Sequence, residues 1–129
     1  MKLLTHNWRL GLCCVASLTC LLLLASMPAK AQGRYDGARD LVVRTQEDLR
    51  RASGFVREKK DERERIENAQ KHLSDFDRSL SKNKFDKDRL NEAIDDLKNV
   101  VNHNTLSGED RDALTQDLQD LRAIRSRHD

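Results

Sequence analysis

The chain has 129 residues, of which 36% are charged and only 4% aromatic. Its 24 lysines and arginines nearly balance its 22 aspartates and glutamates, which excludes a general electrostatic case for nucleic-acid binding. All three cysteines lie within residues 1–31, so the rest of the chain has no thiol for catalysis, metal binding or disulfides. A single proline and an abundance of Glu, Lys, Arg, Leu and Ala favour helices over strands.

Residues 1–31 have the order of a secretory signal peptide. Lys2 and Arg9 supply a positive start, residues 10–25 form an apolar stretch, and Ala29–Ala31 is a small-x-small cleavage pattern. Cleavage at this point removes three basic residues and changes the formal charge from +2 to −1. We therefore expect an exported protein that is periplasmic or secreted.

Two other fates of this N-terminal segment stay open. Cys20 would carry the lipid of a lipoprotein, although the apolar run continues past it. An uncleaved segment would remain as an N-terminal anchor, although it is short for a membrane span, which needs about 20 residues. Contact with a membrane is therefore expected only if the signal is retained.

Residues 32–60 are predicted to form an N-terminal helical segment. Asp36 is the expected N-cap, because its carboxylate can accept the first free amide protons of a helix. Gly54 weakens the helix by about 1 kcal/mol, so we expect one long helix over residues 36–80 that is bent there. Residues 36–56 have few apolar companions, which predicts the less stable part of the fold or an oligomer contact. Their apolar face recurs at spacings of three and four, at Val42, Thr45, Leu49, Ala52 and Val56.

Residues 57–65 are charged without interruption. Opposite signs fall four residues apart more often than like signs do, and each such pair stabilises a helix by a few tenths of a kcal/mol. We interpret the run as solvated helix. A charged docking surface and a hinge are the alternatives.

Residues 61–129 are predicted to form a helical bundle domain. An apolar face runs from Ile66 to Leu80, and two shorter helices are expected over residues 86–101 and 107–126. These two should fold back as a hairpin onto the first face. The sequence thus predicts an all-α protein, with a long N-terminal helical segment and a C-terminal hairpin that together form a small three-helix bundle. Its expected core is Ile66, Leu73, Phe76, Leu80, Phe85, Leu90, Ile94, Leu97, Leu114, Leu118 and Leu121.

The ends of the two shorter helices carry capping signals. Asp86 and Ser107 are the expected N-caps. Phe85, just before the first cap, can pack on Leu90 as a hydrophobic staple. Residues 102–105 are interpreted as a helix exit, because asparagine tolerates the left-handed conformation that ends helices.

Residues 84–104 resemble part of a tetratricopeptide repeat. Phe85-Asp86, the run Leu90–Leu97 and the run Asn102–Asn104 are similar to the second helix of such a unit and its Asn-containing exit. The resemblance implies packing as a helical hairpin and carries no ligand residues over. The proline usual after the exit is missing, as is the aromatic and glycine pattern of a first helix.

The histidines and carboxylates outside the signal lack the spacing of a catalytic or metal site. No histidine there stands four residues from another, and HExxH is absent. His103 beside Asp95 and Asp96 is the best metal candidate, against the simpler interpretation of a polar loop histidine. Aspartates alternate near Asp77 as in calcium loops, but Lys82 stands where glycine is required. We predict no catalytic, cofactor-binding or metal-binding residue, and no enzymatic activity.

Residues 122–128 form the only local basic cluster. They can touch anionic lipid, envelope polymer or nucleic acid, but compensation of a helix dipole explains them more simply. No aromatic residues interleave with the arginines to stack on bases, so no specific nucleic acid is expected as a partner.

A thin apolar core and narrow apolar faces predict a helical protein that self-associates or binds a protein partner. We therefore expect an exported, non-enzymatic interaction or scaffold protein of the cell envelope. The alternative is a periplasmic chaperone or stress-sensor-like protein that binds unfolded clients. A chaperone would suppress aggregation of a test client, whereas a scaffold would capture one defined partner.

Overall fold

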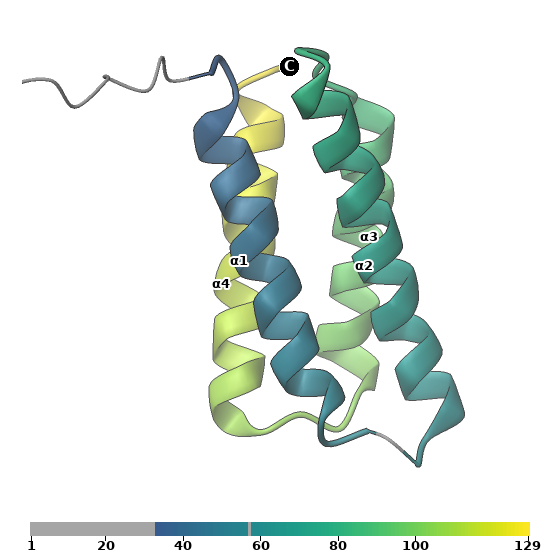
Figure 1. Ribbon diagram of the computed structural model, residues 1–129. Coiled ribbons are helices and arrows are strands. Elements are labelled where there is room, and N and C mark those ends of the chain that lie inside the picture. Colours follow the sequence, from purple (N-terminus) through teal and green to yellow (C-terminus); the bar gives the residue numbers. More distant parts are fainter. Residues whose placement is uncertain (1–32, 57) are drawn as a thin grey trace, which may run out of the picture. The chain divides into compact units, whose positions relative to one another are not determined.

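The computed structural model of the chain describes residues 33–56 and 58–129 (Figure 1). The predicted signal peptide, residues 1–31, lies outside the described residues. The described part is all-helical, as the sequence predicts, and none of its helices is both long and apolar enough to cross a membrane. It contains four helices, α1 (Asp36–Ser53), α2 (Lys60–Ser81), α3 (Lys87–His103) and α4 (Gly108–Ser126).

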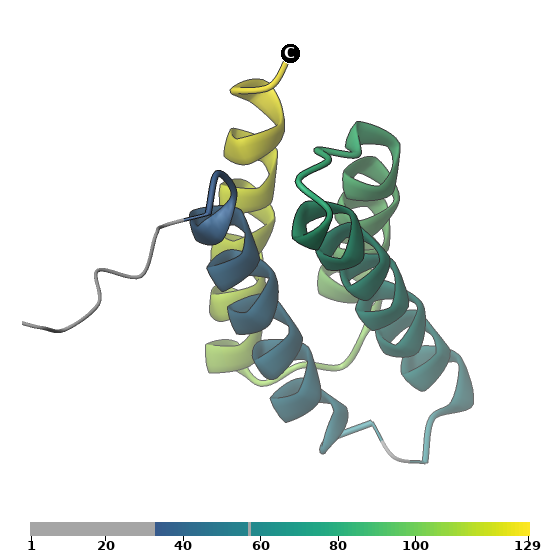
Figure 2. The same cartoon turned by 45° about the horizontal axis from the view of Figure 1, so that its top comes forward.

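The four helices pack in a ring, each against two neighbours. Consecutive helices run in opposite directions, as short connections favour, and α4 closes the ring against α1 (Figure 1; Figure 2). Within the described residues, the backbones of α1 and α3, and those of α2 and α4, do not approach closely across the diagonals. The prediction that both C-terminal helices pack on the Ile66–Leu80 face is therefore wrong for α4, which packs on α1 and α3 instead.

The predicted single long helix over residues 36–80 is also wrong. α1 ends at Ser53, and the N–H groups of Gly54 and Phe55 bond to carbonyls three residues back, which tightens the last turn. Val56 is fully buried, so apolar packing draws the chain into the end of the bundle before α2 begins. The break lets α1 and α2 run antiparallel to each other.

α1 is a full member of the core, which corrects the three-helix bundle to a four-helix bundle. Val42 and Leu49 are fully buried, so residues 36–56 do not lack apolar companions. The sequence did not indicate which helices pack on α1, because α4 contacts both α1 and α3. The boundary expected between residues 60 and 61 falls inside one compact unit, Gln32–Asp129.

The charged run 57–65 divides between loop and helix. Lys60 opens α2, and the rest of the run to residue 65 continues it. Glu58 and Lys59 lead into the helix, and Arg57 lies outside the described residues.

The core predicted from residues 66–121 is confirmed. Its members are buried except Phe85, which is half-buried and meets Phe76 edge to face, with ring centroids 5.5 Å apart. Phe76 itself is fully buried. Each such apolar side chain contributes about 1.5–3 kcal/mol by leaving water.

Two of the three predicted caps are confirmed. Asp86 and Ser107 each accept a backbone N–H from the first turn of their helix, at 3.3 and 3.0 Å. The prediction for Asp36 is wrong, because Tyr35 occupies the N-cap position without a capping bond. The carboxylate of Asp36 turns back instead and accepts the N–H of Gly33 at 2.6 Å.

Hydrogen bonds tie the α3–α4 loop to α2. Asn104 has φ −92° and ψ 150°, so it is not left-handed as expected for this exit. Its side chain donates to the Glu62 carbonyl at 2.8 Å and accepts from Arg65 at 2.7 Å. The Glu62 carboxylate accepts the N–H of Thr105 at 2.8 Å. Among described non-glycine residues, the positive φ belongs to Asn83, at 57°, just after α2.

Candidate functional site

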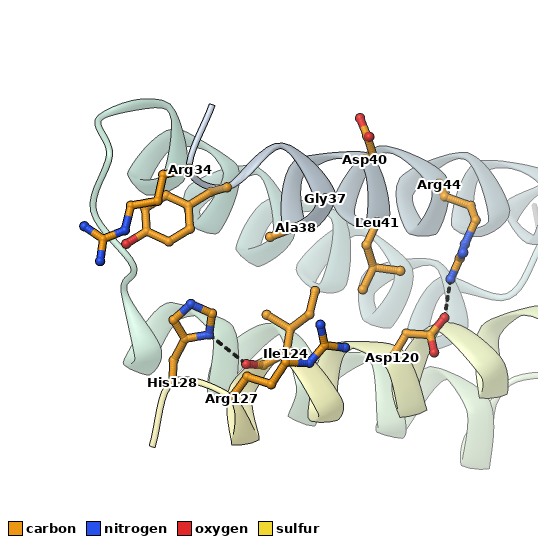
Figure 3. Close-up of a pocket in the computed structure, with 11 residues that line it drawn as sticks. Arg34, Gly37, Ala38, Asp40, Leu41, Arg44, Asp120, Ile124, Arg127 and His128 are labelled. Atoms are coloured by element: carbon orange, nitrogen blue, oxygen red, sulfur yellow. Dashed lines mark hydrogen bonds and ion pairs between the residues drawn. The ribbon is translucent and has the colours of Figure 1, made fainter. Parts of the chain in front are cut away.

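An open groove of about 630 Å³ runs between the N-terminal half of α1 and the C-terminal half of α4 (Figure 3). Ligand sites in proteins commonly enclose about 300–1,000 Å³, so its size lies in that range. The groove exists because α4 packs against α1. Its lining is Arg34, Tyr35, Gly37, Ala38, Asp40, Leu41, Arg44, Asp120, Ile124, Arg127 and His128.

Apolar side chains from both helices form the floor of the groove. Ala38 and Leu41 stand three residues apart on α1 and are buried, and Ile124 on α4 is half-buried against the same core. Gly37 borders this floor, and a Cβ placed on it would meet no atom within 4 Å. The missing side chain therefore leaves the α1 side of the groove open.

Three aromatic rings pack together at the end of the groove near the start of α1. Phe85, from the α2–α3 loop, stacks on His128 with centroids 3.8 Å apart and ring planes 7° apart. Tyr35 lies 6.0 Å from Phe85 and 6.1 Å from His128. The Nδ1–H of His128 donates to the Ile124 carbonyl at 2.9 Å and so holds the imidazole in place. The rings join the start of α1 to the end of α4.

The rim of the groove carries more cations than carboxylates. Arg34, Arg44 and Arg127 stand against Asp40 and Asp120. The guanidinium of Arg34 lies over the ring of its chain neighbour, 5.6 Å from the centroid. In the part of the chain that the structure describes, neither Arg34 nor Arg127 has a side-chain hydrogen bond or ion pair, so both are available to an anionic group.

Arg44 joins α1 to α4 through two carboxylates. Its guanidinium lies 2.6 Å from Asp117 and 2.7 Å from Asp120 (Figure 3 shows the second contact). The hydrogen bonds to Asp120 and Asp117 raise the pKa of Arg44, and the bond from Arg44 lowers the pKa of Asp120. The Arg44 side chain is 52% exposed and that of Asp117 only 1%, so one end of this pair is in water and the other inside the protein.

Asp117 is a buried carboxyl group that interacts with Asp48 across the α1–α4 contact. Its Oδ1 accepts from Arg44 at 2.8 Å, whereas its buried Oδ2 has no donor among the described residues. Burial raises the pKa of Asp117 and outweighs the lowering by Arg44, and Asp48 raises it further. A second carboxylate close by favours the protonated form of Asp117.

Replacing Arg44 with alanine is expected to lower the free energy of unfolding by about 2 kcal/mol at pH 7. Removing one partner of a buried ion pair costs about 3–5 kcal/mol, and the cost is smaller here because Arg44 is half in water. The pKa of Asp117 is raised in the folded state. Loss of Arg44 therefore destabilises the protein above that pKa, where Asp117 is ionised and left without its cation. Below that pKa Asp117 is protonated, and this cost disappears. The bond to Asp120 behaves differently, because the pKa of Asp120 is lowered below 3.8, so its contribution is still present at pH 4.

Urea unfolding at pH 7 and pH 4 measures this effect. The loss in Arg44→Ala should be clearly smaller at pH 4. Arg50→Ala is the matched control, because Arg50 pairs with Glu47 on the surface of the same helix, and such pairs contribute about 0.2–1 kcal/mol. An equal loss from Arg44→Ala at the two pH values would contradict the assignment of a buried, protonatable partner.

The histidines lie apart from one another. His72 Nδ1 is 2.6 Å from Asp96 between α2 and α3, so Asp96 is engaged by His72 rather than by His103. His103 is exposed at the end of α3, and His128 belongs to the ring group. Within residues 33–56 and 58–129, no three His, Cys, Asp or Glu side chains gather as a metal site.

The acidic and basic clusters noted in the sequence serve mainly to join helices. Asp77 accepts from Arg39 of α1 at 2.9 Å. In the basic tail, Arg125 donates to Asn91 of α3 at 3.2 Å, whereas Arg127 lines the groove. In this tail, Arg125 therefore holds α4 against α3, and Arg127 forms part of the groove.

Sequence reasoning did not identify the groove or the buried carboxyl group. Both depend on which helices become neighbours, and α1 with α4 was not an expected pair. One signal was available, because Asp48 precedes Leu49 and Asp117 precedes Leu118. Each carboxylate therefore borders the apolar face of its own helix.

Comparison with known protein families, with curated proteins and with solved structures found no match to this chain.

Proposed function

We propose that this chain is an exported, non-enzymatic interaction or scaffold protein of the cell envelope that binds a segment of a partner protein in the groove between α1 and α4. One observation carries the proposal. An apolar floor containing Leu41 and Ile124 lies beside two guanidinium groups, Arg34 and Arg127, that lack ion-pair partners among the described residues. Polar groups that converge beside apolar side chains are typical of binding sites, because they fix the orientation of the ligand.

The partner segment that fits this groove has an apolar side chain flanked by aspartate or glutamate. Apolar surface placed on the floor leaves water, which is worth about 25 cal/mol per Å². A guanidinium can hold a carboxylate through two parallel hydrogen bonds. The excess of cations on the rim also favours acidic partners over basic ones.

The variant Gly37→Glu tests the proposal. The new carboxylate stands at the rim, where it competes for the guanidinium groups and repels an acidic partner. The space is open, a glutamate in the first turn suits the helix dipole, and removal of a helical glycine adds up to about 1 kcal/mol of stability. The variant should therefore fold normally.

Gly108→Glu is the matched control, because Gly108 is also in a first helical turn with no atom within 4 Å of its Cβ position. It opens α4, whereas the groove lies along the other half of that helix. Affinity capture from the cells of origin should return one partner with the wild type and with Gly108→Glu, and lose it with Gly37→Glu. Equal capture of that partner by all three proteins would place the binding surface elsewhere.

Two exposed apolar residues favour a second candidate, the binding of unfolded clients. Phe55 and Val43 are 68% and 62% exposed. Isolated apolar residues are common on protein surfaces, so this candidate ranks below the groove. Suppression of the aggregation of an unfolded test client, weakened by Phe55→Ser but not by Gly37→Glu, would support it against the groove.

A further inference from the structure

A chain of contacts connects the groove to a buried carboxyl group that does not line it. Arg44 and Asp120 line the groove, and Arg44 bonds to both Asp120 and Asp117. Asp117 is 1% exposed, and Asp48, which faces it from α1, is 8% exposed. A change of charge at the buried carboxyl group therefore changes the electrostatic attraction on Arg44, which lines the groove.

This pair of carboxyl groups lacks one hydrogen-bond donor. When both are ionised, neither can donate, and Asp117 Oδ2 has no partner among the described residues. A buried acceptor without a partner is costly. A proton on Asp117 turns its carboxyl group into a donor and removes the repulsion between the two negative charges.

The charged groups around the pair come from α1 and α4. Arg44 and Arg51 are the cations on α1, of which Arg51 pairs with Asp48. Asp120 is the neighbouring carboxylate on α4. On the α3 side, Arg111 and Arg125 of α4 donate to backbone carbonyls and to Asn91, and neither arginine contacts Asp48 or Asp117 in these bonds.

On its remaining side, α1 meets α2. The polar contacts there run from Arg39 to Asp77 at 2.9 Å and from Gln46 to Ser74 at 2.8 Å. They engage neither carboxyl group of the pair. Two cations and one further carboxylate therefore set its charge balance.

We infer that Asp117, with Asp48 beside it, is a proton-binding switch that controls the charge offered by Arg44 to the groove. With both groups ionised, the guanidinium of Arg44 forms ion pairs with Asp117 and with Asp120. With a proton on Asp117, only Asp120 holds the guanidinium through its charge, and Arg44 can turn to a carboxylate in the groove. The switch rests on the proposed function in that the groove is the site it regulates.

The direction of the coupling follows from linkage. An acidic segment that draws Arg44 away from Asp117 promotes uptake of a proton by the pair. By reciprocity, the protonated protein binds that segment more tightly than the ionised protein does. Binding in the groove is thus stronger in acid, within the range in which Asp117 titrates.

A titration followed by nuclear magnetic resonance tests the switch without any partner. The probes are the carboxyl carbons of Asp48 and Asp117 and, in the groove, the Gly37 amide and the Tyr35 ring of the full chain. The carboxyl group of Asp117 should titrate above the ordinary aspartate value of 3.8, and the groove signals should move with the same midpoint. Titration of Asp117 at or below the ordinary value, or groove signals that do not change with this step, would overturn the inference.

Variants separate the pair from other carboxylates. Asp117→Asn should abolish the shared step in the groove signals, and Asp48→Asn should do the same if the first variant does not fold. Asp96→Asn is the control, because Asp96 lies between α2 and α3, and the step should persist in it. A step that survives in both pair variants would overturn the switch. If the groove signals titrate as described but the protein captures no partner, the proposed function is overturned and the switch is not.

Discussion

Replacing Phe76 with alanine is expected to lower the free energy of unfolding by about 4 kcal/mol. Truncation of a buried phenylalanine costs about 3–5 kcal/mol, because it removes apolar contact and leaves a cavity. Phe76 is fully buried and also meets Phe85 edge to face, so both terms apply. Domains of this size are stable by only about 5–15 kcal/mol, so the variant should be close to unfolding. Urea denaturation followed by circular dichroism measures the loss.

The control for this prediction is another phenylalanine. Phe55 is 68% exposed, and Phe55→Ala should change the stability by less than about 0.5 kcal/mol. The Phe85 ring contacts that border the groove should loosen in Phe76→Ala alone. Similar losses in the two variants would contradict the placement of Phe76 at the centre of the bundle.

Leu49→Ala is expected to destabilise the protein by about 3 kcal/mol. Leucine-to-alanine changes in cores cost about 2–5 kcal/mol, and Leu49 is fully buried on α1. A loss of this size requires α1 to be one wall of the core. If residues 36–56 were instead a loosely attached extension, the loss would be well below 1 kcal/mol.

Val43→Ala is the matched control on the same helix, because Val43 is 62% exposed. Its effect should stay within about 0.5 kcal/mol. The same reasoning applies to deletion of residues 32–60. The three-helix hypothesis expects a folded remainder, whereas the four-helix bundle expects loss of helicity. Chemical denaturation of the two point variants and circular dichroism of the truncated chain check both statements.

Local features of the fold were predictable from the sequence because they depend on local chemistry. The apolar residues at spacings of three and four fixed the core faces, and Asp86 and Ser107 cap the helices they precede. Such signals need only neighbouring residues. Asp36 is not a cap because its carboxylate accepts the N–H of Gly33 instead, in a bond that is also local.

The pairing of helices was not predictable by the same means. The break after Ser53 depends on the burial of Val56 at the end of the bundle, and Gly54 alone suggested only a bend. Once α1 is separate, it can close the ring against α4, and the groove follows. Sites built between non-consecutive elements depend on contacts far apart in sequence, as Arg44 with Asp117 shows.

The most direct measurement of the central claim is site-specific crosslinking in the cells of origin. A photoreactive phenylalanine analogue is placed at Asp40, on the rim of the groove, or at Val43, exposed on the same helix. We expect a discrete adduct with one partner from position 40 and none from position 43. An adduct from position 43 with none from position 40 would contradict binding in the groove between α1 and α4.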